Sequence, residues 1–389
     1  MKQVMRKTAN YAADLAGINS ALYELGGLII MHDASGCNST YATHDEPRWA
    51  KMHSLIFISA LEEYDAILGN DDKLIEEVIE AANETQPNFI ALFGSPIALA
   101  IGTDFKGIAH YIEQETKLPC FGFSTSGMAS YVCGSNQAYL AFAKRFCQPV
   151  PKEHTGIGIN LLGCTPLDFG YSGNVEALEA WCKDQGFTIV SNWSMGTSFE
   201  QMQKALAADV NLVLSSSAID VAKYFAETWG IPYVVGIPMG EKQAIQLAEQ
   251  IHHPLQTPKP VKAGNGKVLL IGESVCMQAL RTCLQEEFGY KDVQILCPLE
   301  VQVGLSEDDV CWDQEDLIQK KMNAAKLVIA DPIYQRLLEN KTTHFIPLPH
   351  WGYSGRMYKE QMPVLIGPSF SNWLKDQLDF KKREGILDV

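Results

Sequence analysis

The sequence lacks the short motifs and long apolar runs that assign many proteins to a class. None of its ten cysteines belongs to a CxxC pair, so zinc ribbons and thioredoxin-like redox sites have no support. No stretch reaches the roughly 18–20 apolar residues of a membrane span. The basic start, Met1–Lys7, is not followed by an apolar run of signal-peptide length. We therefore expect a cytoplasmic protein, without a membrane partner, whose cysteines are free thiols.

Positive charge is also scarce. The 31 lysines and arginines are outnumbered by 46 aspartates and glutamates, which gives a formal net charge of −15. This balance argues against a nucleic-acid partner, because duplex binding favours a basic surface.

The sequence contains no GxxxxGK[ST], HExxH or GxSxG motif. Gly156–Gly158 lacks the third glycine of a dinucleotide fingerprint and lies at the start of a predicted strand, so we expect no dinucleotide site there.

Three successive cycles of apolar strand, polar loop and helix fill the 389 residues. This length exceeds one hydrophobic core and suits two or three domains. Apolar strands that alternate with helices indicate parallel sheets, so the predicted fold class is α/β. We expect domains at residues 1–150, 151–260 and 261–389, the last two separated by a proline-rich linker. We also expect a helix over residues 1–26, and a second over residues 73–83 with Asp72 as its cap.

Residues 28–40 combine a strand end with a cysteine. The apolar lead Leu28–Ile30 stops at small and polar residues, and Gly36 lets the backbone approach closely beside Cys37. A cysteine on such a loop is a candidate ligand to a metal cluster. An unpaired cysteine is more often a small buried hydrophobe. On these residues alone, both interpretations stay open.

Five segments, taken in order, resemble motifs of the nitrogenase component 1 family, and the resemblance extends over about residues 10–375. They are His32–Cys37, Glu62–Leu74, Phe93–Asp104, Asn211–Pro232 and Trp351–Gly355. That family includes molybdenum-iron protein subunits, cofactor-assembly scaffolds and chlorophyll-pathway reductases. The resemblance implies three Rossmann-like domains with parallel sheets around a central cleft. It also implies an enzyme subunit, one half of the catalytic component of an ATP-dependent reductase. A separate iron protein would use the ATP and deliver the electrons.

The resemblance makes Cys37 a metal ligand, because the matching family cysteine binds an iron-sulfur cluster. Gly36 precedes it in the motif, and Ser95 stands where cluster-rich members have another cysteine. The family's cofactor-binding cysteine falls near Ser215, and no cysteine lies near Tyr11–Ala13. One cysteine cannot hold a [4Fe–4S] cluster, which takes four ligands, or a P-cluster-like one. The resemblance therefore implies a cluster shared with a homologous component 1 subunit, which is either a three-cysteine relative or a second copy.

Two other functions stay open. One is a scaffold that carries a metallocofactor during assembly, and the other is a plain small-molecule-binding α/β protein in which Cys37 is inert. The small-molecule substrate of a reductase is not identified by the sequence. We expect Arg48 and Trp49 to form a subunit contact rather than a substrate site. His350 either points into the central cleft or is a structural residue. We expect three other cysteines to pack in the apolar core: Cys120, Cys133 and Cys147.

Overall fold

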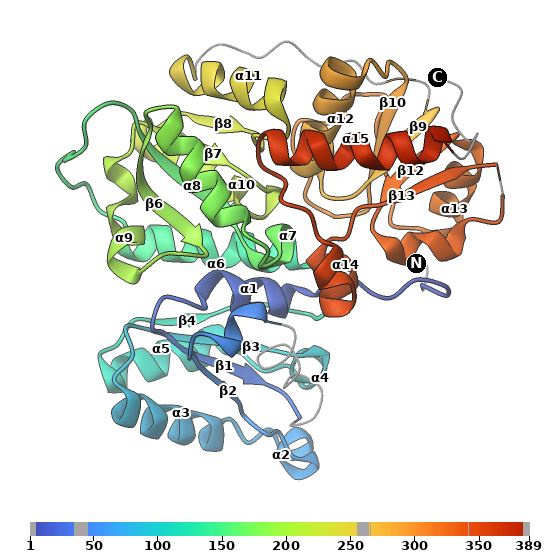
Figure 1. Ribbon diagram of the computed structural model, residues 1–389. Helices are drawn as coiled ribbons and strands as arrows, with labels where there is room; N and C mark the ends of the chain where they lie inside the picture. The colour runs from blue at the N-terminus through green and yellow to red at the C-terminus, as the bar shows by residue number, and fades with distance from the viewer. Residues whose placement is uncertain (1–4, 35–45, 255–263, 265, 341, 384–389) are drawn as a thin grey trace.

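Three separate parallel sheets form the framework of the chain (Figure 1). A computed structural model describes residues 5–34, 46–254, 264, 266–340 and 342–383. Most of the central strands are buried along their whole length, which is typical of parallel sheets covered by helices on both faces. This arrangement confirms the predicted α/β fold class.

Each sheet joins its strands in an order that differs from their order along the chain. The first sheet has the order β2 (Leu55–Ile58), β1 (Leu28–His32), β3 (Ile90–Gly94) and β4 (Cys120–Gly122). The second has the order β6 (Thr188–Ser194), β5 (Gly158–Cys164), β7 (Val210–Val213) and β8 (Tyr233–Val235). The third has the order β11 (Val310–Cys311), β10 (Val293–Cys297), β9 (Val268–Ile271), β12 (Leu327–Ala330) and β13 (His344–Pro347).

The helices follow the same division. Those before and within the first sheet are α1 (Asp14–Leu22), η2 (Pro47–Ala50), α2 (Glu63–Leu68), α3 (Asp71–Thr85), α4 (Pro96–Ile101), α5 (Phe105–Thr116) and α6 (Tyr131–Phe146). Those of the second are α7 (Pro166–Phe169), α8 (Asn174–Asp184), α9 (Phe199–Gln203), η3 (Lys204–Ala207), η4 (Ser216–Ala218), α10 (Ile219–Trp229) and α11 (Glu241–His252). Those of the third are α12 (Ser274–Phe288), α13 (Glu315–Ala324), η5 (Pro332–Leu337), α14 (Trp351–Ser354), η6 (Gly355–Gln361) and α15 (Pro368–Arg383).

Two local predictions were wrong. The first helix begins only at Asp14, because the residues before it run extended along the third sheet and Ala12 N–H donates to the Gly352 carbonyl at 2.8 Å. Helix α3 begins at Asp71 with Asn70 as its N-cap, so Asp72 lies inside the first turn. The predicted proline-rich linker overlaps residues 255–263, which lie outside the described part of the chain.

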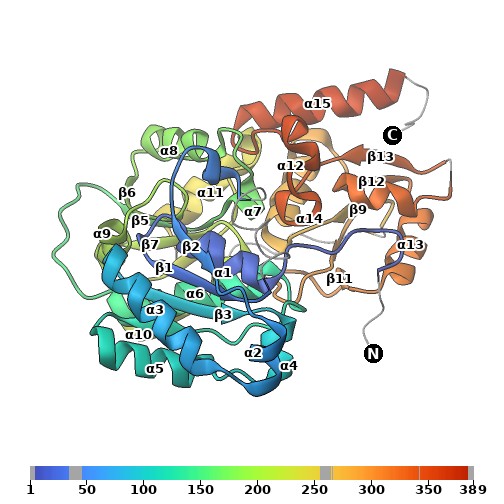
Figure 2. The ribbon, with the colours of Figure 1, turned by 90° about the horizontal axis from the view of Figure 1, so that it is seen from below.

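Helices α1 and α6 pack directly against each other between the first sheet and the other two (Figures 1 and 2). Glycine is required at their closest points. A Cβ on Gly17 would lie 2.0 Å from the Tyr131 carbonyl oxygen, and a Cβ on Gly134 would lie 1.9 Å from the Asp14 carbonyl oxygen. This close helix pair holds the first sheet at a fixed place beside the second.

The apolar core also crosses between sheets. One cluster of buried side chains includes residues of both the second and third sheets, and another includes residues of both the first and second. The connections near residues 150 and 260 lie between sheets, and we propose them as the domain boundaries. Within the described residues, no helix is long and apolar enough to cross a membrane.

Candidate functional site

The carboxyl ends of all four strands of the first sheet meet at one edge. Strand β1 ends at His32, whose Nδ1 lies 2.8 Å from the hydroxyl of Ser59 just after β2. Ser95 follows β3, and its N–H donates to the His32 carbonyl at 3.2 Å. Thr125 follows β4 and accepts a hydrogen bond from Gly94 N–H at 3.0 Å. Such edges are where open α/β sheets bind ligands.

Only one of the three predicted cluster residues, Ser95, lies within the described part of the chain. Cys37 and Gly36 belong to residues 35–45 and lie outside the described part of the chain. Ser95 is described and 3% exposed. Its hydroxyl accepts a hydrogen bond from Ile97 N–H at 3.2 Å and so caps helix α4. The roles of all three residues at a cluster stay predictions.

His32 is a titratable side chain at this edge, and its backbone carbonyl accepts the hydrogen bond from Ser95 N–H. Its ring packs edge-on against Phe105, with the ring centroids 6.1 Å apart. Burial lowers the pKa of His32, although the nearby carboxylates of Asp71, Asp33 and Asp65 act in the opposite direction. A lowered pKa favours the neutral imidazole, in which one ring nitrogen donates a hydrogen bond and the other accepts one.

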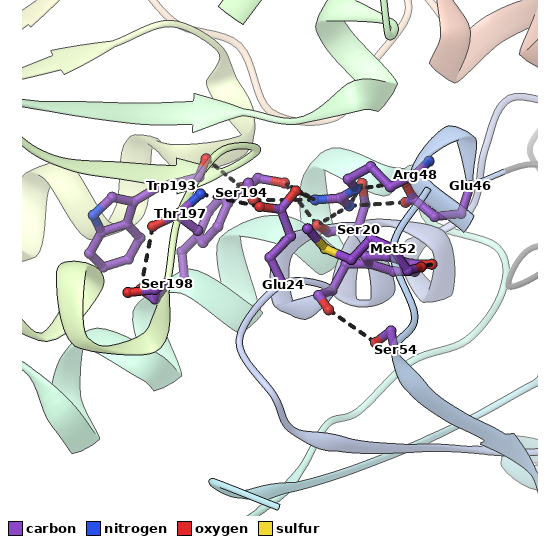
Figure 3. A network of polar contacts seen from close by, with 12 residues as sticks. Ser20, Glu24, Glu46, Arg48, Met52, Ser54, Trp193, Ser194, Thr197 and Ser198 are labelled. Atoms are coloured by element: carbon purple, nitrogen blue, oxygen red, sulfur yellow. Dashed lines mark hydrogen bonds and ion pairs between the residues drawn. The ribbon is translucent and has the colours of Figure 1, made fainter. Parts of the chain in front are cut away.

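A buried ion-pair network is centred on Arg48, in the short helix η2 (Figure 3). Arg48 is only 1% exposed. Its Nε donates to Glu46 Oε1 at 2.7 Å, and its Nη2 donates to Glu46 Oε2 at 3.0 Å. Its Nη1 donates to Glu24 Oε1 at 3.1 Å and to the Ser194 carbonyl at 3.2 Å. One guanidinium thus joins three distant segments of the chain.

This network contradicts the expected role of Arg48. A subunit contact needs an exposed side chain, whereas Arg48 is fully enclosed by Glu46, Glu24 and the ends of α1 and β6. Ser194, whose carbonyl accepts the hydrogen bond from Arg48 Nη1, has φ +110°, a backbone conformation that is unfavourable for residues other than glycine. Arg48 therefore fixes the first and second sheets relative to each other.

A second polar cluster lies between the second and third sheets. Asp168 is buried on α7, and its Oδ1 accepts a hydrogen bond from the Tyr131 hydroxyl at 2.6 Å. The Nε2 of buried His350 lies 3.6 Å from the same oxygen. Neither ring nitrogen of His350 has a hydrogen-bond partner among the described residues. Asp168, His350 and Asp331 border a small void of about 10 Å³, which is room for about one water molecule.

Besides Asp168, this region holds two other buried carboxyl groups, those of Glu273 and Asp331. Glu273 lies at the start of α12 and accepts hydrogen bonds from Cys276 N–H at 2.9 Å and Ser216 N–H at 3.1 Å. Burial, and next the charge of Asp168, raise its pKa. Asp331 accepts from His350 N–H at 2.7 Å, and burial raises its pKa as well. Acids of raised pKa beside a histidine are suited to holding and passing protons.

A larger cavity of about 380 Å³ lies beside this cluster. It is bordered by the extended N-terminal segment, by α1 and by α14 with the residues that follow it. Its wall includes the rings of Tyr11 and Trp351, the amide of Asn19, the carboxylate of Glu46 and the guanidinium of Arg356. This volume suits a small organic molecule. Because Glu46 also binds Arg48, the ion-pair network supports one wall of the cavity.

The described cysteines are poor candidates for metal ligands. The metal-binding form of cysteine is the thiolate, and burial opposes it. Burial raises the pKa of Cys120 and that of Cys147 to about 12. Both thiols pack in apolar clusters, as does Cys133, which agrees with their predicted role in core packing. Within the described residues, no group of three or more metal-binding side chains could hold a metal ion.

Comparison with known proteins decides the family. Residues 25–293 match the family model described as nitrogenase component 1 type oxidoreductase. The chain belongs to the nitrogenase component 1 family. The match includes β1, Ser95, Arg48 and Glu273; it begins after Glu24 and ends before His350. The family resemblance predicted from five short segments is therefore confirmed.

Individual members of the family are only distantly similar to this chain. It is 27% identical over 180 residues to the nitrogenase iron-molybdenum cofactor biosynthesis protein NifE of Clostridium pasteurianum, covering 46% of this chain but only 38% of that one. It is 22% identical over 338 residues to the nitrogenase molybdenum-iron protein alpha chain of Methanothermobacter thermautotrophicus, covering 78% and 70% of the two chains. In three dimensions it is similar to nitrogenase Cp1 at pH 6.5, with a TM-score of 0.72 and 13% identity over 99% of this chain and 95% of that one.

The sequence pointed to some of these features and missed others. His350 was an open candidate, and the structure places it in the buried cluster. Asp168, Glu273 and Asp331 had no motif to mark them, although each comes after the predicted end of a strand, at a carboxyl edge. Arg48 was expected at a subunit contact and is instead buried within the chain. The partners of these side chains come from distant segments, and no local pattern reports such pairings.

Proposed function

We propose that this chain is a subunit of a nitrogenase-like, ATP-dependent two-component reductase. It would accept electrons from an iron protein, which alone uses the ATP, and reduce a small-molecule substrate. The proposal is supported by family membership together with one observation: β1 ends at His32, at the edge where four strand ends meet, and in the sequence Cys37 comes soon after this strand. The described cysteines for which a pKa shift is resolved, in contrast, all have raised pKa values that keep them as thiols.

The residues of this chain fit a shared cluster better than a complete one. Cys37 is the proposed metal ligand, with Gly36 allowing close approach and Ser95 lying beside the cluster without binding iron. An iron-sulfur cluster, [4Fe–4S] or P-cluster-like, needs more ligands than one cysteine, and a [4Fe–4S] cluster takes four; when bound it supplies electron storage and transfer. Since no metal-binding group exists within the described residues, the other ligands are assigned to a homologous component 1 subunit.

Substrate and protons have separate proposed places. The cavity of about 380 Å³ is the proposed substrate site, because its aromatic and polar wall suits a small organic molecule. Reduction also consumes protons, and the Asp168–His350 pair adjoins this cavity through Tyr353, whose ring lies 4.7 Å from that of His350. We assign to this pair the holding and delivery of a proton.

The decisive experiment compares cysteine variants after anaerobic co-expression with neighbouring component 1 and iron-protein genes. Cys37→Ser should lower iron and sulfide content or shift the electron paramagnetic resonance signal, and should abolish reductase turnover. Cys120→Ser and Cys133→Ala are the matched controls, which should keep the cluster and cost about 1–3 kcal/mol of stability. Full iron content, an unchanged spectrum and full activity in Cys37→Ser would overturn the ligand assignment and favour an inert cysteine.

A cofactor-assembly scaffold is the second candidate function. It is favoured by the similarity to NifE, a protein named for cofactor biosynthesis. The two functions differ in turnover. A reductase subunit supports ATP-dependent substrate reduction with its iron protein, whereas a scaffold binds a metallocofactor and releases it to another protein without reducing a substrate.

A further inference from the structure

Two cysteines are paired at the edge of the third sheet. Strand β11 is an outermost strand of that sheet and runs parallel to β10 (Figure 2). In the register of these strands, Cys311 is the partner of Cys297. Among the strand pairs of the described residues, this is the one position at which two cysteines are partners. Both are free thiols in the structure.

The register brings the two residues within the span of a disulfide bond. Partner residues on neighbouring parallel strands point to the same face of a sheet, and the strands lie about 4.8 Å apart. A disulfide bond joins residues whose Cα atoms are about 4.4–6.8 Å apart. Strand β11 has two residues and lies at an edge, so it can adjust its position without displacing another strand.

A buried ion pair holds this register. Both carboxylate oxygens of Asp309, two residues before Cys311, accept hydrogen bonds from Arg281 Nη1 at 2.8 Å. Asp309 Oδ1 also accepts from Ile295 N–H at 2.9 Å, and Ile295 lies two residues before Cys297 in β10. The side chains of Arg281 and Asp309 are 2% and 0% exposed. The two cysteines are therefore held next to each other before any bond forms between them.

The two thiols differ in their access to solvent. Cys311 is exposed, whereas Cys297 is fully buried. A small molecule in solution therefore reaches Cys311 first. Burial raises the pKa of both thiols, and the carboxylate of Asp309 adds to this effect at Cys311. Since the thiolate is the reacting form, exchange at neutral pH is slow, and the pair responds to lasting rather than brief oxidation.

We propose that Cys297 and Cys311 form a reversible disulfide bond, a redox-sensitive modification site that reacts with small-molecule disulfides. The Cys311 thiolate attacks one sulfur of such a molecule, whose S–S bond breaks and releases one thiol. The Cys297 thiolate then attacks the Cys311 sulfur of the mixed disulfide and releases the second thiol. The two cysteines lose two electrons and two protons in total, and the small-molecule disulfide gains them.

The bond closes a loop, residues 298–310, that contacts other parts of the fold. Within this loop Glu300 accepts a hydrogen bond from Ser130 N–H at 3.3 Å, at the start of α6. Cys297 is also close enough to Tyr11 and Tyr353 to act on them electrostatically, and both tyrosines border the cavity of about 380 Å³. Oxidation therefore fixes the edge of the third sheet beside this cavity, whether or not the cavity binds a substrate.

The test maps disulfide bonds in the purified full chain before and after incubation with oxidised glutathione. Free thiols are blocked with iodoacetamide, and the digested protein is analysed by mass spectrometry. We expect two peptides joined through Cys297 and Cys311, with the bond reversed by dithiothreitol. Oxidation should also raise the urea midpoint of unfolding, because a closed loop restricts the unfolded chain. Neither measurement involves iron or turnover, so failure here is distinct from failure of the proposed function.

Three variants separate this pair from general thiol oxidation. Cys297→Ser should retain one glutathione on Cys311, because the second attack cannot occur. Cys311→Ser, at an exposed position, should keep the fold but form no bond and show no rise in the urea midpoint. Cys120→Ser is the matched control, since Cys120 lies on edge strand β4 with Ile90 as its partner, and it should keep the bond.

Three results would overturn the proposal. The first is free thiols at both positions after oxidation. The second is a bond from Cys297 or Cys311 to a different cysteine of the chain. The third is a bond between the Cys311 residues of two chains, which a non-reducing gel would reveal as a covalent dimer.

Discussion

His350 Nε2 lies 3.6 Å from Asp168 Oδ1, and neither ring nitrogen of His350 makes a hydrogen bond with the described residues. Both side chains are buried, so water does not screen their interaction. A histidine and a carboxyl group within reach of each other are the side-chain types that serve as general acid and base. This pair links the fold to the proposed chemistry more directly than any other described side chains.

Asp168→Asn should lower the turnover number about 100-fold while leaving iron content and the cluster spectrum unchanged. The amide keeps the shape of the side chain but cannot exchange a proton, as a carboxyl group can. The measurement is steady-state turnover across pH, because a purely structural role would not alter the pH profile. His154→Gln is the control: His154 keeps the same 3.6 Å distance to Asp209, but at the amino end of β5. An Asp168→Asn enzyme with an unchanged profile would remove the pair from the mechanism.

Arg48→Met should destabilise the protein by about 3–5 kcal/mol, because it leaves Glu24 and Glu46 buried without their cation. Adding Glu46→Gln should recover part of that loss. Urea unfolding followed by intrinsic fluorescence measures both. Arg145→Met is the matched control: its ion pair with Glu113 is exposed and should be worth less than about 1 kcal/mol. Equal losses for Arg48→Met and Arg145→Met would contradict the network of Figure 3.

The difference in unfolding free energy between Glu273→Gln and the parent protein should shift in favour of the variant as the pH rises. Burial, followed by the charge of Asp168, raises the folded-state pKa of Glu273 above its ordinary value of 4.5. The folded state then holds this proton more tightly than the unfolded state. The stabilisation that Glu273 provides at low pH is lost as the pH rises from about 4.5 through the folded-state pKa. Glutamine, always neutral, escapes that loss, and urea midpoints at about pH 5 and about pH 8 measure the difference.

Glu315→Gln provides the control of opposite sign. Burial acts to raise the pKa of Glu315, but the backbone N–H groups of Lys7, Thr8 and Arg6 outweigh it and lower the pKa overall. Its stabilisation is therefore present above the ordinary pKa of 4.5 and is lost as the pH falls. The glutamine variant should be weakest, relative to the parent, at about pH 8. The same pH trend in both variants would show that these carboxyl groups do not set it.

Ser95→Ala should cost about 1 kcal/mol of stability and keep the cluster, because the hydroxyl caps α4 rather than binding iron. Iron content and unfolding free energy are measured on the same preparation. Ser198→Ala, which removes the capping box of α9, gives the stability cost of a cap in another part of the fold. Loss of iron without loss of stability would instead make Ser95 a ligand.

The sequence by itself determined the three cycles of strand and helix and the family. Central strands such as β1, β5 and β9 are apolar on both faces, and helices such as α10 carry a clear amphipathic period and a terminal glycine. These signals are local, so they can be read without knowing the partners. Three short strands at sheet edges, β2, β11 and β13, were not predicted, because edge strands are partly exposed and carry a weaker apolar pattern.

Only the tertiary structure decided which polar residues work together. Arg48 binds Glu24 and Ser194, which are 24 and 146 residues away along the chain. His350, which follows the third sheet, lies beside Asp168, which belongs to the second. Tyr64 and Leu68 are exposed, because α2 lies on the surface while α3 and α5 pack on the sheet. Local patterns fix which segments become helices and strands. Long-range packing decides which side chains lose their water and which keep it.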